Sequence, residues 1–149
     1  MKTVHLIVVA RRAPEWLAAL ESDYIRRLAL FSVQVSVVKP AETADKEAKA
    51  LMAKLAKLPP DARMILLDEK GEAIDSAAFA KRLSLWLEDK TPPVFVICGA
   101  NGASAQIRRS AAHKLSLSAM TFSHATARLV FVEQFFRADC ILRGHPYPR

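Results

Sequence analysis

Apolar residues follow two different periods along most of the chain. Four short runs rich in Val and Ile have the composition of buried strands. They cover residues 3–9, 33–38, 64–67 and 94–98. Between these runs, apolar residues recur at the spacing of amphipathic helices. The predicted helices span about 14–28, 43–58 and 76–90, and Ser76 is expected to cap the third.

The alternation of strands and helices predicts an α/β fold with a mainly parallel sheet and helices on both of its faces. We expect residues 68–71 to turn the chain after the third strand. Beyond the fourth strand the sequence predicts a short helix, a brief strand at 114–117, a polar loop and a final helix. The pattern does not say how this last third is threaded.

The composition is typical of a single domain over residues 1–149. Hydrophobic residues make up 52% of the chain, far from the composition of disordered segments. No apolar run approaches the ~20 residues that span a bilayer, and no signal-peptide pattern is present, so we expect a cytoplasmic protein without a membrane segment. Cys98 and Cys140 have no partner at metal-ligand spacing, which favours free thiols and no metal.

The net charge of +7 adds a first hint of function. Basic surfaces attract polyanions through release of counterions. Many soluble proteins are mildly basic, however, so charge alone leaves a nucleic-acid partner and other partners equally open.

Three loops that follow predicted strands are candidates for a ligand site. They lie at 67–71, 99–102 and 118–123. In open parallel sheets, ligands bind beyond the carboxyl ends of the strands. Gly99 and Gly102 permit close approach of the backbone to a flat ligand, although glycines also form ordinary turns. The chain lacks a dinucleotide fingerprint, a phosphate loop, a nucleophile elbow and an H-E-x-x-H motif, which argues against those enzyme classes.

Two pairs of residues in the final predicted helix are four positions apart. They are His124 with Arg128, and Glu133 with Arg137. Residues at this spacing share one face of a helix. Each pair is a candidate for a functional surface, but solvated or ion-paired positions are the simpler interpretation of spacing alone.

Several short segments carry a more specific signal when taken together. They are LDEKG at 67–71, residues 76–86, FVICGANG at 95–102, residues 115–124, RLVFVEQ at 128–134, Arg137-Ala138 and GHPYPR at 144–149. In this order, over nearly the whole chain from the helix that contains Trp16, they resemble the ribosomal large-subunit methyltransferase H family. Each segment alone is weak evidence, and the ordered set is specific.

The resemblance implies a SPOUT-type fold with a C-terminal trefoil knot, S-adenosylmethionine as cofactor, and a homodimer in which the partner chain completes each active site. The cofactor-site positions carried over are Leu67, Gly99, Ser118, Ala119, Met120, Thr121, Phe122 and Ser123. Main-chain groups of these loops are expected to bind adenine, with the apolar side chains of Leu117, Met120 and Phe122 as its cover.

The resemblance also implies methylation of N3 of a pseudouridine in 23S ribosomal RNA, in the large subunit or the assembled ribosome. The catalytic and RNA-side positions carried over are His124, Arg137, Tyr147 and Arg149, with Arg128 as a weaker candidate. Tyr147 is expected to stack on a base, Arg137 and Arg149 to contact phosphates, and His124 to help remove the imino proton.

The chain departs from the family pattern at three positions. Pro148 stands where relatives carry His, which removes an imidazole and an amide donor. Cys98 replaces a usual Gly, and Ser123 replaces a frequent Pro. Two alternatives therefore stay open: a non-catalytic ribosome-binding or assembly factor on the same fold, and a SPOUT methyltransferase that acts on another RNA such as tRNA.

Overall fold

The Val- and Ile-rich runs form the strands of a parallel sheet. The computed structural model describes residues 1–147, in which five strands have the order β2-β1-β4-β3-β5. They are β1 (Lys2–Val9), β2 (Phe31–Val38), β3 (Met64–Ala73), β4 (Val94–Ile97) and β5 (His113–Ser116). Every residue of β4 is buried, as expected for an interior strand that is covered on both faces.

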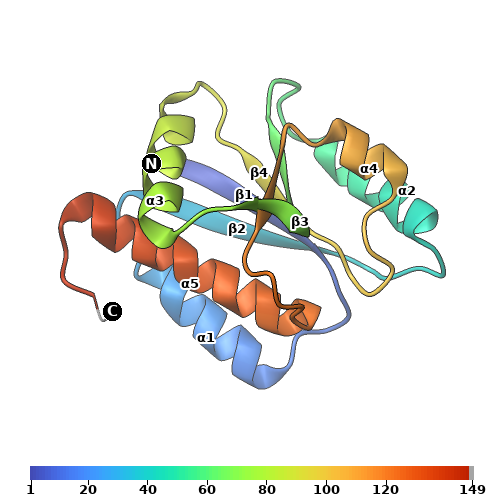
Figure 1. Cartoon of the computed structure of the whole chain (residues 1–149), viewed down its shortest axis with the longest axis horizontal. Helices are drawn as coiled ribbons and strands as arrows, with labels where there is room; N and C mark the ends of the chain where they lie inside the picture. Colours follow the sequence, from blue (N-terminus) through green and yellow to red (C-terminus); the bar gives the residue numbers. More distant parts are fainter. Residues whose placement is uncertain (148–149) are drawn as a thin grey trace.

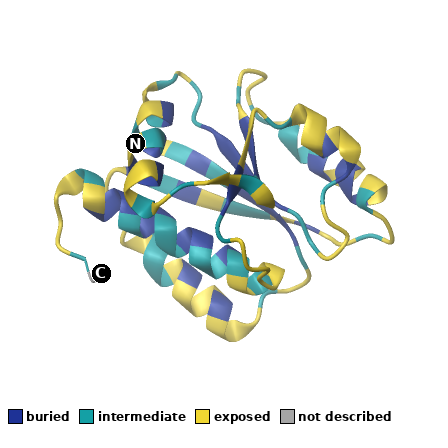
Figure 2. Ribbon diagram, viewed as in Figure 1, coloured by how far each residue is buried: buried dark blue, intermediate teal, exposed yellow. Residues whose placement is uncertain are grey.

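Helices cover both faces of this sheet (Figure 1). One face carries α1 (Glu15–Arg26), α3 (Ser76–Glu88) and α5 (His124–Arg143), and the other carries α2 (Ala44–Leu55) and α4 (Ala105–Ser110). Buried residues lie on the sides of the helices that are turned to the sheet (Figure 2). Within residues 1–147, none of the helices has the length and hydropathy needed to cross a bilayer. The predicted fold class is confirmed.

The two faces of the sheet have different cores. On the face of α5, Phe95 of β4 contacts Phe131 and Phe135 at ring-centroid distances of 5.0 and 5.3 Å. Ring pairs in tilted and edge-on arrangements stabilise a core beyond the burial of apolar area, and they favour particular orientations of the rings. The opposite core is aliphatic and includes Leu51 of α2 and Ile107 of α4. The aromatic core holds the middle of α5, and it thereby fixes both ends of that helix against the sheet.

The third strand is longer than the sequence predicted. Instead of a turn after Leu67, β3 continues, and Leu67 and Glu72 both lie opposite Leu115 of β5. The four residues between them bulge out of the ladder. A Cβ atom on Gly71 would lie 2.7 Å from the backbone carbon of Lys114, so glycine allows the two strands to approach each other here.

The start of α3 also differs from the prediction. Asp75, not Ser76, is the N-cap, and its carboxylate accepts a hydrogen bond from the backbone N–H of Ala78 at 2.7 Å. The hydroxyl of Ser76 donates instead to Gln134 of α5 at 2.6 Å. Both side chains are suitable caps by type, and the local backbone decides between them.

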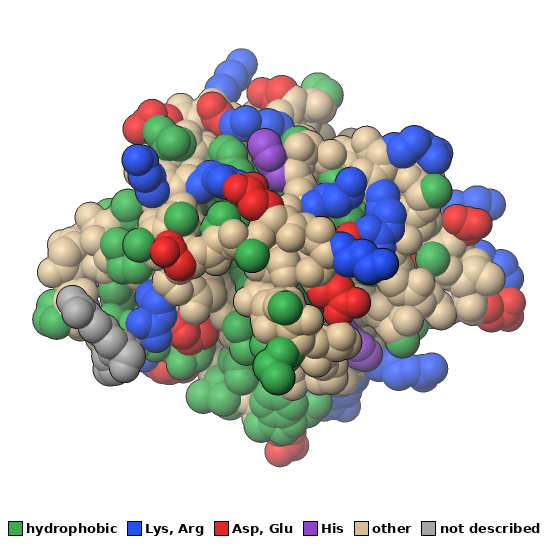
Figure 3. All heavy atoms as spheres, in the orientation of Figure 1, with side chains coloured by type: hydrophobic (Ala, Val, Ile, Leu, Met, Phe, Trp, Pro, Cys, Tyr) green, Lys and Arg blue, Asp and Glu red, His purple; other side chains and the backbone are tan. Residues whose placement is uncertain are grey.

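The outer side of α1 is partly apolar. Leu17 is fully buried against the sheet, whereas Trp16 and Leu20 are 49% and 45% exposed. Figure 3 shows hydrophobic side chains gathered over α1 at the lower edge of the molecule. An apolar strip of this kind on a helix surface is a feature of interaction sites.

Candidate functional site

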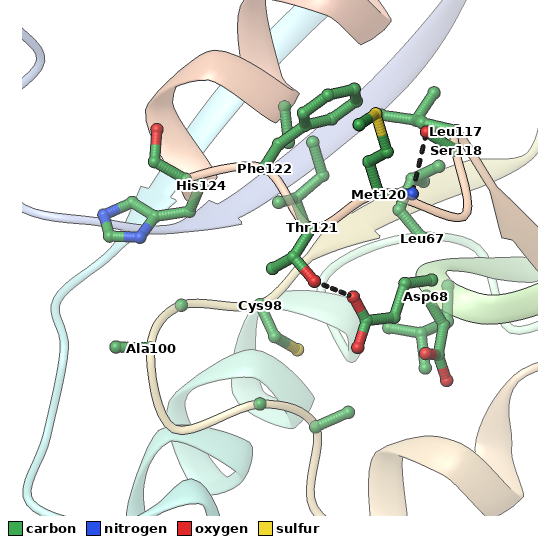
Figure 4. A pocket seen from close by; sticks show the side chains of 18 of the residues that line it. Leu67, Asp68, Cys98, Ala100, Leu117, Ser118, Met120, Thr121, Phe122 and His124 are labelled. Atoms are coloured by element: carbon green, nitrogen blue, oxygen red, sulfur yellow. Dashed lines mark hydrogen bonds between the residues drawn. The ribbon is translucent and has the colours of Figure 1, made fainter.

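A cavity of about 500 Å³ opens beside the bulge of β3 and the carboxyl end of β4 (Figure 4). Its wall contains residues from three separate segments, 66–69, 97–103 and 117–123, and the first turn of α5 closes its rim. The segments meet because β3 lies between β4 and β5 in the sheet. The volume is in the range of cavities that hold ligands of cofactor size.

Hydrogen bonds outside the cavity hold the 99–102 loop in place. Asn101 Nδ2 donates to the carbonyl oxygen of Ala41 at 2.9 Å and to Glu47 Oε2 at 3.3 Å. Glu47 Oε2 also accepts from the backbone N–H of Ala41 at 3.0 Å. Gly102 has a φ of 71°, a left-handed conformation that costs glycine little. This part of the wall is therefore fixed before a ligand binds.

The 118–123 loop is held by its own hydroxyl groups. Ser118 Oγ accepts from the backbone N–H of Met120 at 2.9 Å. Thr121 Oγ1 donates to Glu69 Oε2 at 2.6 Å, which ties the loop to β3. The side chain of Met120 is 75% exposed, so it is free to cover a ligand in the cavity.

Charged groups lie on one side of the cavity, where Asp68 and Arg108 form an ion pair. Burial raises the pKa of Asp68, but the Lys70 N–H and the Arg108 guanidinium outweigh it, and the net pKa lies below the usual value. Asp68 is therefore ionised at neutral pH. In Figure 4, His124 lies on the opposite side of the cavity from this carboxylate.

The thiol of Cys98 lies in the wall of the same cavity but is unreactive at neutral pH. Burial, with a smaller contribution from the carboxylate of Glu47, raises the pKa of Cys98 to about 11. A thiol that stays protonated at neutral pH is a weak nucleophile. Cys98 and Cys140 are both free, as predicted.

The rest of the wall is mainly apolar. Its large apolar side chains are Leu66, Leu67, Ile97, Leu117, Met120 and Phe122. An apolar wall with a few charged and hydroxyl groups at one side suits a ligand that has a flat ring at one end and polar groups at the other. Among residues 1–147, no three Asp, Glu, His or Cys side chains are grouped as metal ligands would be.

Seven of the eight positions predicted for the cofactor site line this cavity. They are Leu67, Gly99, Ser118, Met120, Thr121, Phe122 and Ser123. Ala119 is exposed and is not part of the wall. The backbone of the loop turns it outward between two neighbours that face the cavity.

The positions predicted for catalysis and RNA contact lie in two different places. His124 begins α5 at the rim of the cavity. Arg137 is thirteen residues further along the same helix, which corresponds to roughly 20 Å along its axis. Tyr147 follows the end of the helix, and Arg149 and Pro148 lie outside the described residues. His124 and Arg137 therefore do not meet within one chain.

Arg137 and Tyr147 form a small platform at the far end of α5, here called the Tyr147 platform. The guanidinium carbon of Arg137 lies 4.6 Å from the centroid of the Tyr147 ring, which stacks on Phe136 at 4.9 Å. Arg137 Nε also donates to Glu133 at 3.0 Å. Burial and a hydrogen bond with Tyr24 raise the pKa of Tyr147 to about 12, so the phenol keeps its proton.

Arg128, the weaker candidate for RNA contact, is a structural residue. It is 6% exposed, and its Nε and Nη2 donate to the two carboxylate oxygens of Glu21 at 2.6 and 2.8 Å. A guanidinium engaged in this way inside the protein does not reach an external phosphate. The ion-paired interpretation of Arg128 is therefore confirmed, and its contact with RNA stays a prediction.

Sequence reasoning missed Arg108 as part of the cavity wall. It lies in α4, a helix of six residues that follows the glycine loop. A single arginine in a short helix carries no signal of its own. The order of the strands supplies the missing information, because it sets α4 beside the segment that contains Asp68.

Comparisons with known proteins agree with this geometry. The family described as "Predicted SPOUT methyltransferase" matches residues 1–148. A protein named ribosomal RNA large subunit methyltransferase H from Polynucleobacter asymbioticus is 36% identical over 145 residues, 97% of both chains. Proteins of the same name from Laribacter hongkongensis and Oleidesulfovibrio alaskensis are 37% and 35% identical, with 98% and 99% of both chains covered. The chain belongs to the SPOUT methyltransferase family.

Proposed function

We propose that this protein is an S-adenosylmethionine-dependent methyltransferase that modifies N3 of a pseudouridine in 23S ribosomal RNA of the large subunit. The observation that carries the proposal is the meeting of three loops around one cavity in a chain of this family. The name that its relatives share, ribosomal RNA large subunit methyltransferase H, supports the class of substrate.

The chemistry of the wall fits S-adenosylmethionine, which supplies a methyl group from a sulfonium centre. Leu117 and Phe122 are apolar covers for the adenine ring, and main-chain groups around Gly99 are its hydrogen-bonding partners. The carboxylates of Asp68 and Glu69 are acceptors for ribose hydroxyls or for the ammonium group. The methyl donor thus needs no activation by the protein, whose task is alignment.

His124 is the candidate for handling the proton of the acceptor. N3 of pseudouridine carries an imino proton that must leave when the nitrogen gains a methyl group. The imidazole of His124 is exposed at the rim of the cavity, and imidazole is a common proton acceptor in catalysis. We assign it the role of receiving this proton and passing it to solvent.

We propose that the active protein is a homodimer in which the Tyr147 platform of one chain completes the cavity of the other. The distance between His124 and Arg137 along α5 supports this arrangement, because one chain cannot bring the two together. Tyr147 then offers a ring for stacking on RNA, and Arg137 and Arg149 offer positive charge for phosphates.

The apolar strip on α1 is the surface that suits such a dimer. Trp16 and Leu20 are exposed, and α1 lies beside α5 (Figure 1). A two-fold interface uses the same patch on both chains. A contact through α1 therefore brings the partner close to α5.

We further propose that residues 1–149 form one domain whose C-terminal segment is threaded as a trefoil knot. Because its substrate is the ribosome, we assign the protein to the cytoplasm.

The direct test is methyl transfer from labelled S-adenosylmethionine to assembled ribosomes, isolated large subunits and tRNA. The proposal predicts label in 23S ribosomal RNA that maps to a pseudouridine. Label in tRNA alone would support the other RNA substrate. Calorimetry with S-adenosylmethionine separates the remaining alternative, because tight binding to ribosomes without cofactor binding is the behaviour of a non-catalytic factor.

The departure at the C-terminus has its own test. Pro148→His introduces the residue type that the family resemblance leads us to expect at this position. A rise in methyl transfer by this variant would show that the proline lowers activity, and an unchanged rate would show that the imidazole is dispensable here.

A further inference from the structure

A second, smaller cavity lies beside the first. It has a volume of about 190 Å³ and is bounded by the β1–α1 loop and the first turn of α5. Ile97 and His124 line both cavities, so the two share a wall. The volume is below the range of cavities for cofactor-sized ligands and suits a single small ring.

Two arginines of this second cavity form no ion pair within residues 1–147. Of the eleven arginines within residues 1–147, eight pair with a carboxylate. Arg11 and Arg12 belong to the other three, and both are exposed where they line the cavity. Figure 3 shows basic side chains at the lower right, where the β1–α1 loop runs. Guanidinium groups left free in this way are available to an external anion.

Apart from His124, the rest of the lining consists of small and apolar residues together with Arg128, which is paired with Glu21. Ala13, Ala125 and the buried Leu17 are among the small and apolar ones. A planar base fits such a slot by shape and apolar contact, while its phosphates stay outside in reach of the positive charge.

We propose that this second cavity receives the pyrimidine base that is to be methylated, with Arg11 and Arg12 bound to the phosphates that flank it. The inference rests on the proposed function and names the place where the RNA enters the site. The base leaves its stack to reach the cavity, as bases do in enzymes that modify them. The methyl group then comes to N3 from S-adenosylmethionine in the first cavity. His124 lines both cavities, so it can accept the N3 proton.

The charge part of the proposal is tested with Arg11→Gln/Arg12→Gln. Its matched control is Lys49→Gln/Lys81→Gln, which removes the same charge from exposed positions on α2 and α3. We expect the KM for large subunits to rise at least about tenfold in the arginine variant. The slope of log affinity for RNA against log salt should become shallower by about 1.4, the value for two phosphate contacts on single-stranded RNA. Affinity for S-adenosylmethionine should be unchanged in both variants.

The shape part is tested with Ala125→Leu, which fills the second cavity without touching a charge. We expect a loss of about a hundredfold in kcat/KM, because the base is displaced from the methyl donor. The salt slope and the affinity for S-adenosylmethionine should stay at wild-type values. Ala50→Leu on α2 is an exposed control for the added side chain, and thermal melting shows that both variants are folded.

Two results overturn the inference while the proposed function stands. One is a wild-type KM and salt slope for Arg11→Gln/Arg12→Gln, and the other is wild-type turnover of large subunits by folded Ala125→Leu. If the wild-type protein itself transfers no methyl group to ribosomal RNA, the proposed function fails and the inference fails with it.

Discussion

The first turn of α5 borders two cavities and leaves its histidine exposed, whereas the last turns of the same helix keep their polar side chains engaged. Asp139, fully buried, accepts from the backbone N–H groups of Ala29 and Leu30 at 3.0 and 2.8 Å. It also accepts from Arg143 Nε at 2.8 Å. His124 lies at the other end of the helix, at the rim of the larger of the two cavities.

The two ends of α5 therefore have different roles: we assign catalysis to the first turn and stability to the last turns. The role proposed for His124 requires that its imidazole reach the substrate, and its exposure at the first turn allows this. Contacts of Asp139 fix the far end of the helix, and they thereby give the Tyr147 platform a defined place. We infer that the first turn tolerates mutation structurally but not catalytically, and that the last turns behave in the opposite way.

The largest expected effect is on stability and comes from Asp139 near the C-terminal end of α5. Asp139→Ala removes the acceptor of two backbone N–H groups and the partner of Arg143. We expect the free energy of unfolding to fall by about 3 kcal/mol, measured by urea denaturation. Affinity of the folded protein for S-adenosylmethionine should fall by less than methyl transfer does, because Asp139 reaches the site only through the Tyr147 platform.

Asp139→Asn is the matched control. The amide keeps one oxygen for the backbone N–H groups and loses the charge that faces Arg143. We expect it to cost about 1 kcal/mol. Wild-type stability of Asp139→Ala would show that the hydrogen bonds to Asp139 do not stabilise the protein.

The next effect lies at the exposed end. His124→Ala should lower the rate of methyl transfer by about a hundredfold, because a general base contributes roughly this much. Its free energy of unfolding should stay within about 0.5 kcal/mol of wild type, since the side chain is exposed. Single-turnover kinetics and urea denaturation measure the two quantities. A stable variant with full activity would remove His124 from the mechanism.

The smallest effect concerns Cys98 in the wall of the larger cavity. Its pKa is about 11 in the folded protein against 9.0 for a free thiol, chiefly because of burial. Between these pH values the unfolded chain releases a proton that the folded chain keeps, so stability falls as pH rises. We expect wild type to lose about 1–2 kcal/mol over this window relative to Cys98→Ala. Equal pH dependence of the two proteins would mean that the thiol is not shielded.

The loops of the cavity were predictable because two simple patterns converge there. Alternating strands and helices imply a parallel sheet, and parallel strands present their carboxyl ends on one edge. That reasoning led to Gly99 and to the loop at 118–123, and both line the cavity. It did not reveal the bulge after Leu67, which depends on close approach of β5 to Gly71. Strand pairing of this kind is set by tertiary contact and not by the local sequence.

The positions on α5 show a second limit of sequence reasoning. His124 and Arg128 are four residues apart and share the same expected face, yet one is exposed and the other is buried against Glu21 of α1. Sequence spacing predicts which residues share a face of a helix. It does not predict that an acidic residue of another helix, here Glu21 of α1, lies next to one of them. The family resemblance, by contrast, is confirmed by matches along nearly the whole chain.

The central claim is that one active site takes His124 from one chain and Arg137 from another. Mixing His124→Ala with Arg137→Ala tests it most directly. If the chains reassociate at random, half of the dimers are mixed and each has one intact site of two, so activity should recover to about a quarter of wild type. A mixture no more active than the two variants measured separately would contradict a site shared between chains.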